Sequence, residues 1–450
     1  MPGPEFLSGV IEGFYGRPWS FEQRASLLPR LHALGLNTYV YAPKDDIKLR
    51  TRWREQYDGV ETDRLSALVR TCHEAGLRFV YAISPGLDVR YGEPVDLAWL
   101  IGKVDRVLSL GARDVALLFD DIPYRLHPED EARFQGLASA QAHLAEGLFE
   151  HLRQVRPDGL RLVGPTVYCR RHADARSDGW QYLRDLGQRL GDDVDVFWTG
   201  DDVVSEHLDA AAMADVRAAL GRRPVLWDNL HADDYDVRSV YLGPYAGRAA
   251  DLPAAIRGIV TNPNGALVLN EVPFATFAAF LRAPEGYRPE SALGDALAHW
   301  RLCLDSDCGD AITSDELWLL IELFHLPWRC GPGVEARLAD AAALLAAAPD
   351  PDDARLSRLE GFAKDVSRLF RRLTELRDRE LFYALHGVAL EACRDSRVLV
   401  KYLRHRAEHG PTVRYGRPDR LPNTYRRGFA ASVHELLPLD SDGAIRPTDG

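Results

Sequence analysis

Two adjacent carboxylates, Asp120 and Asp121, directly follow an apolar run at 116–119. Adjacent carboxylates repel each other and partial burial opposes ionisation, so one of the pair is expected to hold its proton near neutral pH. A proton-holding acid beside an ionised carboxylate is the arrangement that glycoside cleavage needs. Neighbouring strand residues point to opposite faces, so both can face one site only if the strand ends there, as Pro123 favours. A helix N-cap or a solvated loop is the alternative.

A glycine-rich aromatic segment near the N-terminus is the second chemical signal. The apolar run at 9–12 leads into Gly-Phe-Tyr-Gly-Arg-Pro-Trp at 13–19. This pattern predicts a strand that runs into a tight loop. Glycines carry no side chain, so the backbone of such a loop can approach a ligand closely.

The regular alternation of strand and helix patterns predicts the elements that position these residues. Short apolar runs, ended by Gly, Pro, Asp or Asn, predict eight strands. They lie at 6–12, 38–43, 79–85, 114–120, 161–168, 194–199, 224–230 and 258–263. Helical patterns separate them, and another follows at 271–283. Eight β/α units favour a (β/α)8 TIM barrel over residues 1–290; an open doubly wound sheet is the alternative.

The pattern changes beyond residue 290, where strand runs vanish. Helical periodicity at 291–304, 313–325, 333–348, 351–379 and 380–408 predicts a helical bundle domain over 291–409. Residues 410–450 are rich in Pro, Arg, Asp and Gly and are expected to form an extended tail that docks on a surface. The helical region is also a candidate for homodimer formation.

In a TIM barrel the active site lies at the carboxyl ends of the strands, where this sequence gathers polar and aromatic residues. Sugar sites use aromatic rings because a pyranose face is apolar while its rim needs hydrogen bonds. Each ring is equally well explained as barrel core. The candidates are Gly13, Lys44, Asp120, Asp121, Tyr168, Thr199, Trp227, Asn229, Asp234 and Asn262.

Composition narrows the class of protein. The 450 residues carry a formal net charge of -12, which argues against a nucleic-acid partner. The sequence contains no run of about 18 apolar residues, so no membrane span is expected. The start of the chain lacks the pattern of a signal peptide, so a cytoplasmic location is expected. The six cysteines are scattered without a CxxC pair, so neither a disulfide framework nor a metal site is expected.

Six motifs make the sequence resemble glycoside hydrolase family 84, the O-GlcNAcase and β-N-acetylglucosaminidase family. They occur in family order between residues 9 and about 265. The motifs are GVIEGFYGRPW at 9–19, LFDDI at 118–122, PTVY at 165–168, WTG at 198–200, WDNLHADDYD at 227–236 and TNPN at 261–264. The region after the barrel carries no motif that we match to the family.

The resemblance implies removal of terminal β-linked N-acetylglucosamine with retention of configuration and no cofactor. The substrate's 2-acetamido oxygen would attack the anomeric carbon and form an oxazoline. By this similarity Asp120 orients and polarises the acetamido N–H, and Asp121 protonates the leaving oxygen and then activates water. Tyr168 would hydrogen-bond the acetamido oxygen, supported by Asn229.

The same resemblance assigns the remaining residues to substrate binding. Asp234 and Asn262 would bind sugar hydroxyls, with Lys44 and the Gly13 backbone also on the sugar. The natural partner would be a glycoprotein or small glycoside that carries N-acetylglucosamine.

Two departures from the family pattern bear on specificity. The acetyl pocket would be walled by Trp227 and Thr199. Gly164 sits where relatives often carry a small side chain, so this pocket is expected to be deeper. Asp201 and Asp202 are expected to add negative charge near the mouth of the site.

Two other functions stay open. A hexosaminidase acting on cell-wall or chitin-derived oligosaccharides is the first; a different hexosaminidase family would pair Asp with Glu, which the Asp-Asp pair disfavours. A non-catalytic glycan-binding protein is the second, and it has no need of a paired acid.

Overall fold

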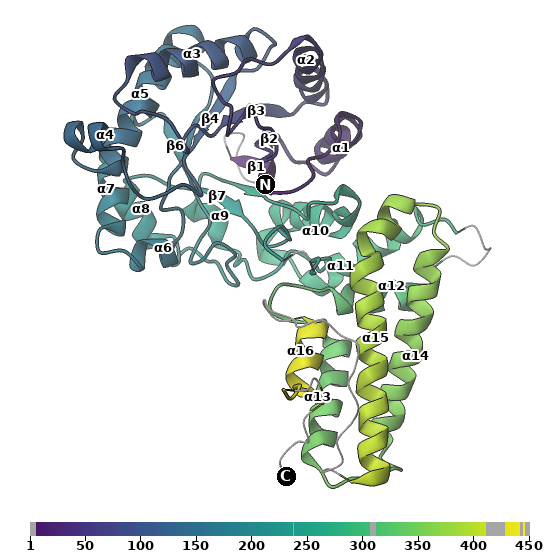
Figure 1. Cartoon of the computed structure of the whole chain (residues 1–450). Helices are drawn as coiled ribbons and strands as arrows, with labels where there is room; N and C mark the ends of the chain where they lie inside the picture. The colour runs from purple at the N-terminus through teal and green to yellow at the C-terminus, as the bar shows by residue number, and fades with distance from the viewer. Residues whose placement is uncertain (1–5, 237, 307–311, 411–427, 442–443, 446–450) are drawn as a thin grey trace. The chain divides into compact units, whose positions relative to one another are not determined.

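Eight parallel strands close into a barrel in chain order (Figure 1). The computed structural model describes residues 6–236, 238–306, 312–410, 428–441 and 444–445. The strands are β1 (Leu7–Glu12), β2 (Thr38–Tyr41), β3 (Arg78–Ile83), β4 (Asp114–Leu118), β5 (Arg161–Gly164), β6 (Val194–Trp198), β7 (Val225–Asp228) and β8 (Gly258–Thr261). All eight predicted strands and the TIM-barrel fold are confirmed.

The barrel interior is filled by side chains from alternate strand positions. Its core cluster includes Ile11, Val40, Leu118, Leu162 and Trp227 from five different strands. Parallel strands covered by helices are buried on both faces, which explains why each strand reads as a nearly continuous apolar run. This packed core fixes where each strand ends, and therefore where the polar residues after it begin.

Helices surround the barrel in Figure 1. They are α1 (Phe21–Ala33), α2 (Gly59–Glu74), α3 (Pro94–Leu108), α4 (Pro128–Arg133), α5 (Leu137–Val155), α6 (Arg170–Asp174), α7 (Gly179–Arg189), α8 (Ala214–Leu220), α9 (Leu252–Ala255) and α10 (Glu271–Arg282). Ser20 begins α1 with a capping box that pairs it with Gln23. Short 3-10 turns lie at Leu267–Leu269 and Pro284–Gly286.

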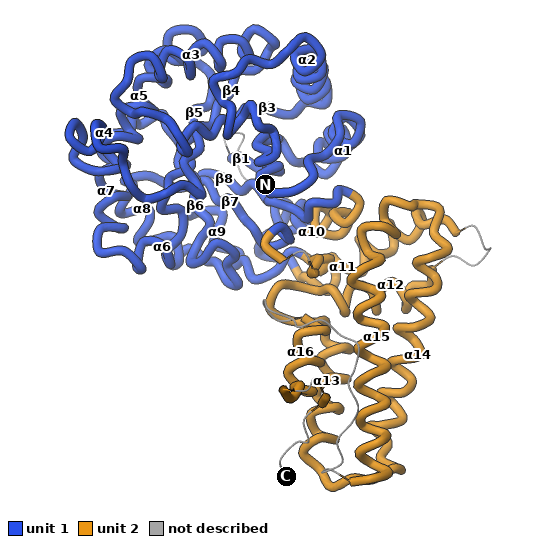
Figure 2. The backbone as a smooth tube through the Cα atoms, in the orientation of Figure 1, with its two compact units in different colours: residues 1–234, 245–267, 277–287 blue, residues 235–244, 268–276, 288–450 orange. Residues whose placement is uncertain are grey.

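The chain divides into two compact units (Figure 2). The first comprises residues 1–234, 245–267 and 277–287. The second comprises 235–244, 268–276 and 288–450, so two segments within the expected barrel range belong to it. Its further helices are α11 (Pro289–Arg301), α12 (Ser314–Leu323), α13 (Pro332–Ala346), α14 (Ala354–Thr374), α15 (Arg379–His409) and α16 (Phe429–Leu436).

The expected extended tail is wrong for residues 429–436, which form α16. Phe429 packs against Phe362 of α14 with ring centroids 5.7 Å apart, and Val433 is fully buried. The apolar face of α16 is buried against the other helices of the bundle, and this burial stabilises a helix despite the turn-forming residues around it. The part of the predicted tail at 411–427 lies outside the described residues. Among the described residues, every helix is too short or too polar to cross a membrane.

Candidate active site

Asp120 is the buried member of the carboxylate pair that follows β4. It is 9% exposed, and its Oδ2 forms an ion pair with the ammonium group of Lys44, from the loop after β2. Its other oxygen, Oδ1, is buried and has no hydrogen-bond partner within the protein. Since buried polar atoms are normally paired, this oxygen is available to a donor from outside the chain.

Asp121 is exposed and adopts a left-handed backbone conformation with a φ of 53°. It is the one non-glycine residue with positive φ in the part of the chain that the structure describes. This conformation costs about 1–2 kcal/mol and takes the backbone out of the extended geometry of the strand. It resolves how two adjacent carboxylates share one site, because the strand geometry ends before Asp121.

Two tyrosine hydroxyls hold the Asp121 carboxylate. Tyr168, after β5, donates to Oδ1 at 2.7 Å, and Tyr15, after β1, donates to Oδ2 at 3.0 Å. Burial and the Asp121 charge raise the pKa of both tyrosines, so both remain protonated donors at neutral pH. The family resemblance assigns the Tyr168 hydroxyl to the acetamido oxygen, and in this structure that hydroxyl donates to Asp121.

Hydrogen bonds between amide groups link the ends of β1, β7 and β8. The Gly13 N–H donates to Asn262 Oδ1 at 3.2 Å, and Asn262 Nδ2 donates to Asn229 Oδ1 at 2.9 Å. The Trp227 ring lies against Gly13, where an added Cβ would be 2.3 Å from the ring, so only glycine fits. The Lys44 ammonium lies 5.5 Å from the Trp227 ring centroid, which places this ring beside the Lys44–Asp120 pair.

Two further carboxylates line the loop after β7. Asp234 Oδ2 accepts the backbone N–H of Tyr15 at 2.8 Å, and burial raises the pKa of Asp234. Asp233 Oδ1 accepts the Gly265 N–H at 2.8 Å, and burial raises the pKa of Asp233 to about 7. The structure therefore places Asp234 beside Tyr15 and Asp233 on the loop after β8.

The free energy of unfolding should depend on pH through the protonation of Asp233. Its folded-state pKa of about 7 lies above its ordinary value of 3.8, so folding favours the protonated form. The stability that this proton supplies is complete below pH about 4 and is lost as the pH rises through 7. The isosteric D233N variant keeps the acceptor for Gly265 but cannot ionise. In urea titrations its unfolding midpoint should fall less than the wild-type midpoint between pH 5 and pH 8. Equal falls in both proteins would contradict the assignment.

Thr199 lies next to Tyr168 at the end of β6, as expected. Its backbone N–H donates to the Tyr168 carbonyl at 2.8 Å, and its hydroxyl donates to the Asp202 carbonyl at 2.8 Å. Asp201 and Asp202, which were expected to add negative charge near the site, each form an ion pair with an arginine. Arg170 pairs with Asp201 at 2.9 Å and Arg171 pairs with Asp202 at 2.7 Å. Arg170 also pairs with Asp215 at 2.8 Å, so the two arginines offset only part of the charge of these three aspartates.

Gly164 faces Leu118, its register partner on β4. A Cβ added at Gly164 would lie 2.8 Å from Leu118 Cδ2, its nearest neighbour. The space that the glycine opens is therefore taken up by this leucine. The packing gives no support to the expectation that Gly164 deepens an acetyl pocket beside Thr199 and Trp227.

Replacing Gly164 by cysteine should act on stability rather than on acyl specificity. Overpacking against Leu118 is expected to lower the free energy of unfolding by about 1–3 kcal/mol. The ratio of kcat/KM for N-butanoyl over N-acetyl glucosaminides should stay nearly unchanged, because Leu118 already fills the space beside Gly164. Gly102→Cys on α3, where an added Cβ meets no atom within 4 Å, is the control. A large drop in the ratio would restore the deeper-pocket interpretation.

The sequence reasoning did not assign two residues that contact the carboxylate pair. Tyr15 belongs to the aromatic segment at 13–19, and its hydroxyl contacts Asp121. Arg50 lies in the loop after β2, 7% exposed, and its Nη2 donates to the Asp121 carbonyl at 2.9 Å. An arginine six residues after Lys44 gives no local signal of this contact, because its partner lies 71 residues further along the chain.

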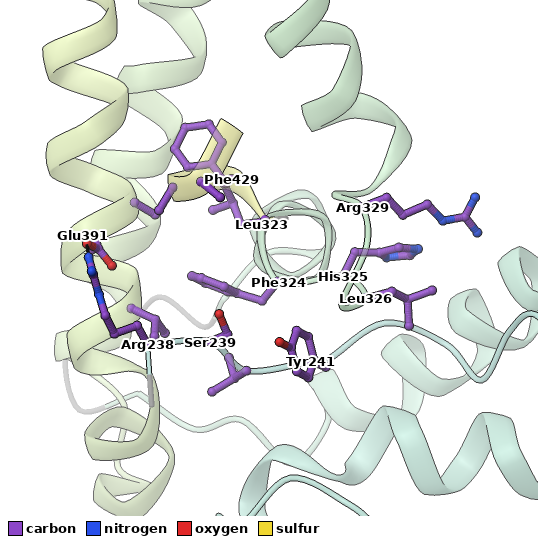
Figure 3. Close-up of a pocket in the computed structure, with 16 residues that line it drawn as sticks. Arg238, Ser239, Tyr241, Leu323, Phe324, His325, Leu326, Arg329, Glu391 and Phe429 are labelled. Carbon is purple, nitrogen blue, oxygen red and sulfur yellow. Dashed lines mark hydrogen bonds and ion pairs between the residues drawn. The ribbon is translucent and has the colours of Figure 1, made fainter. Parts of the chain in front are cut away.

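A small cavity of about 40 Å³ lies in the second unit (Figure 3). Arg238 on its wall forms an ion pair with Glu391. Glu391, Asp395 and His434 form the one group of three potential metal ligands within the described residues, with ligand atoms within 4.8 Å of one another. The guanidinium already supplies a positive charge there, and the volume suits about one water molecule. We assign it no part in catalysis.

Comparison with known proteins agrees with this geometry. The profile of the NAGidase family, described as beta-N-acetylglucosaminidase, matches residues 8–311. Protein O-GlcNAcase of Mus musculus is 40% identical over 292 residues, which are 65% of this chain and 32% of that protein. Protein O-GlcNAcase of Rattus norvegicus gives the same values, so the chain spans about a third of the length of these relatives.

A solved structure adds the comparison of folds. A variant of Thermobaculum terrenum O-GlcNAc hydrolase matches with a TM-score of 0.76 at 27% identity, over 89% of this chain and 83% of that chain. The family profile covers well over half of the present sequence, including every strand of the barrel. The chain therefore belongs to the beta-N-acetylglucosaminidase family of glycoside hydrolases, which is the family that its motifs predicted.

Proposed function

We propose that this protein is a retaining exo-β-N-acetylglucosaminidase that removes terminal β-linked N-acetylglucosamine by substrate-assisted catalysis. The observation that carries the proposal is the pairing of Asp120 with Asp121. One Asp120 oxygen is neutralised by Lys44, and the other is buried without a partner. A buried acceptor of this kind suits the N–H of a 2-acetamido group.

Asp120 acts on the acetamido group in the first step. Its Oδ1 accepts the acetamido N–H, which orients the group and raises electron density on its carbonyl oxygen. That oxygen bonds to the anomeric carbon as the glycosidic C–O bond breaks. Asp121 gives its proton to the leaving oxygen, and the sugar becomes a bicyclic protonated oxazoline whose N–H stays hydrogen-bonded to Asp120.

Asp121 reverses its role in the second step. As a carboxylate it takes a proton from water while the water oxygen bonds to the anomeric carbon and opens the oxazoline. Two inversions at this carbon give net retention. The hydroxyls of Tyr15 and Tyr168 stabilise the carboxylate between the two steps.

The remaining candidates bind the sugar in this proposal. Asn262 and Asp234 bind hydroxyls, with Lys44 and the Gly13 backbone beside them. The acetyl group lies against Trp227 and Thr199, near Asn229. The names of the mammalian relatives and of the bacterial hydrolase favour N-acetylglucosamine on Ser or Thr of proteins as the substrate.

A chromogenic β-N-acetylglucosaminide tests the activity, and an oxazoline mimic tests the mechanism. The enzyme should release the aryl group, and a thiazoline analogue of the oxazoline should inhibit competitively and tightly, as mimics of intermediates do. A covalent sugar trapped on any Asp or Glu, found by mass spectrometry, would overturn substrate assistance. Binding of the glycoside without turnover would identify a glycan-binding protein instead.

A competition between substrates tests the natural target. Release of N-acetylglucosamine from a glycosylated protein is compared with release from a chitin-derived disaccharide. We expect the higher kcat/KM on the glycoprotein. A clear preference for the disaccharide would favour the hexosaminidase alternative on cell-wall or chitin oligosaccharides.

A further inference from the structure

Arg50 is held rigidly beside the carboxylate pair by the loop after β2. The carbonyl of its neighbour Leu49 accepts the N–H of Ser84, at the end of β3, at 2.9 Å. Three residues further on, Trp53 is fully buried and donates its Nε1–H to Asp88 at 2.8 Å. The loop is thus fixed on both sides of Arg50, so the position of its guanidinium is determined by the scaffold.

The guanidinium reaches Asp121 by two routes. Nη2 donates to the Asp121 backbone carbonyl at 2.9 Å. The guanidinium carbon also lies 5.7 Å from the ring centroid of Tyr15, whose hydroxyl donates to the Asp121 carboxylate. One side chain therefore contacts the main chain of Asp121 directly and its carboxylate through Tyr15.

The charge of Arg50 is unusual for a buried arginine. No carboxylate forms an ion pair with it among the described residues, and its Nη1 is buried without a hydrogen-bond partner. Burying a charge without a countercharge is costly, and fold stability alone does not favour it. The unpaired charge of Arg50 lies next to Asp121, whose left-handed backbone, with a φ of 53°, is itself costly.

We propose that Arg50 is a positioning residue for Asp121. It holds the left-handed Asp121 backbone so that the carboxylate stays on the same side as that of Asp120, and it fixes the Tyr15 ring whose hydroxyl donates to the carboxylate. A planar guanidinium can donate to a carbonyl and lie over an aromatic ring at once, whereas an ammonium group is a compact point charge without this fork. This inference rests on the proposed role of Asp121 as the acid.

The test uses two variants and a series of leaving groups. R50Q removes the charge and the fork, and R50K keeps only the charge. Values of kcat/KM are measured on an alkyl β-N-acetylglucosaminide, which needs protonation, and on a dinitrophenyl one, which does not. A displaced acid should lower kcat/KM on the alkyl glycoside about 100-fold in R50Q and change it little on the dinitrophenyl glycoside. R50K should show the same pattern with a smaller loss.

A matched control and a double variant separate positioning from general damage. R52Q changes an arginine two residues along the same loop whose side chain is 56% exposed, and it should leave both kcat/KM values unchanged. In a D121N background, R50Q should cause no further loss on the alkyl glycoside, because the acid it positions is already absent. If R50Q does not fold, R50K in both backgrounds gives the same test.

Three results would overturn the inference. They are equal losses on both leaving groups, an additional loss in the D121N background, and an unchanged kcat/KM on the alkyl glycoside in R50K. The wild-type protein is measured first. Failure of the wild type to hydrolyse either glycoside would overturn the proposed function itself, whereas an active wild type with uniform losses in the variants overturns only the role of Arg50.

Discussion

Replacing Asp121 by asparagine is expected to slow hydrolysis of alkyl β-N-acetylglucosaminides by roughly 10²–10⁴-fold, the usual contribution of a general acid. Asparagine fills the same volume and keeps an oxygen that can accept from Tyr15 or Tyr168, so the loss reports on the missing proton. Aryl glycosides with activated leaving groups need little protonation, and their kcat/KM should fall much less. Steady-state kinetics across a series of leaving groups measures the difference.

The Asp120→Asn variant is the matched comparison. Asp120 acts on the acetamido group whatever the leaving group is, so D120N should slow alkyl and aryl glycosides alike. The buried ion pair with Lys44 is lost in this variant, and circular dichroism should confirm that the barrel stays folded. If both variants lost activity equally on every leaving group, the two roles would be wrongly assigned.

Replacing Arg248 by methionine should give the largest loss of stability. Arg248 and Asp228 form a buried bidentate pair, with distances of 2.5 Å and 2.8 Å, and both side chains are at most 1% exposed. Burial would raise the pKa of Asp228, but Arg248 holds it below its ordinary value. Breaking such a pair leaves a buried charge without compensation, so R248M should lower the free energy of unfolding by about 3–5 kcal/mol at pH 7.

The pH and two control variants test the cause. The Arg248 effect should be smaller at pH 4 than at pH 7. Without Arg248, burial raises the pKa of Asp228, so at the lower pH the unpaired carboxyl takes up a proton instead of remaining a buried charge. The double variant R248M/D228N should recover part of the loss, since no charge is then left unpaired. R52M breaks an exposed pair with Glu55 and should cost about 0–1 kcal/mol. Equal losses in R248M and R52M would contradict this account.

The barrel fold could be predicted because its sequence pattern, an apolar strand run followed by a helical segment, is local and repeats along the chain. Each barrel strand is buried on both faces, so it appears as an apolar run that ends where the barrel ends. The same pattern places Asp120, Trp227 and Asn262 at strand ends, and all three lie where they were expected. The sequence pattern did not predict helix α16, because its apolar face is buried only by packing against the distant helices α13 and α15.

The sequence by itself therefore determined the barrel, its family and the acid pair, while the tertiary structure decided how the pair is held. Asp121 has a left-handed backbone, and its contacts with Tyr15, Tyr168 and Arg50 join residues 47 to 106 positions apart. Leu118 fills the space beside Gly164 because register sets them opposite each other. Burial periodicity encodes which face of an element is covered. Burial periodicity does not indicate which distant side chains come into contact in the closed barrel, because these contacts depend on both the strand register and the paths of the loops.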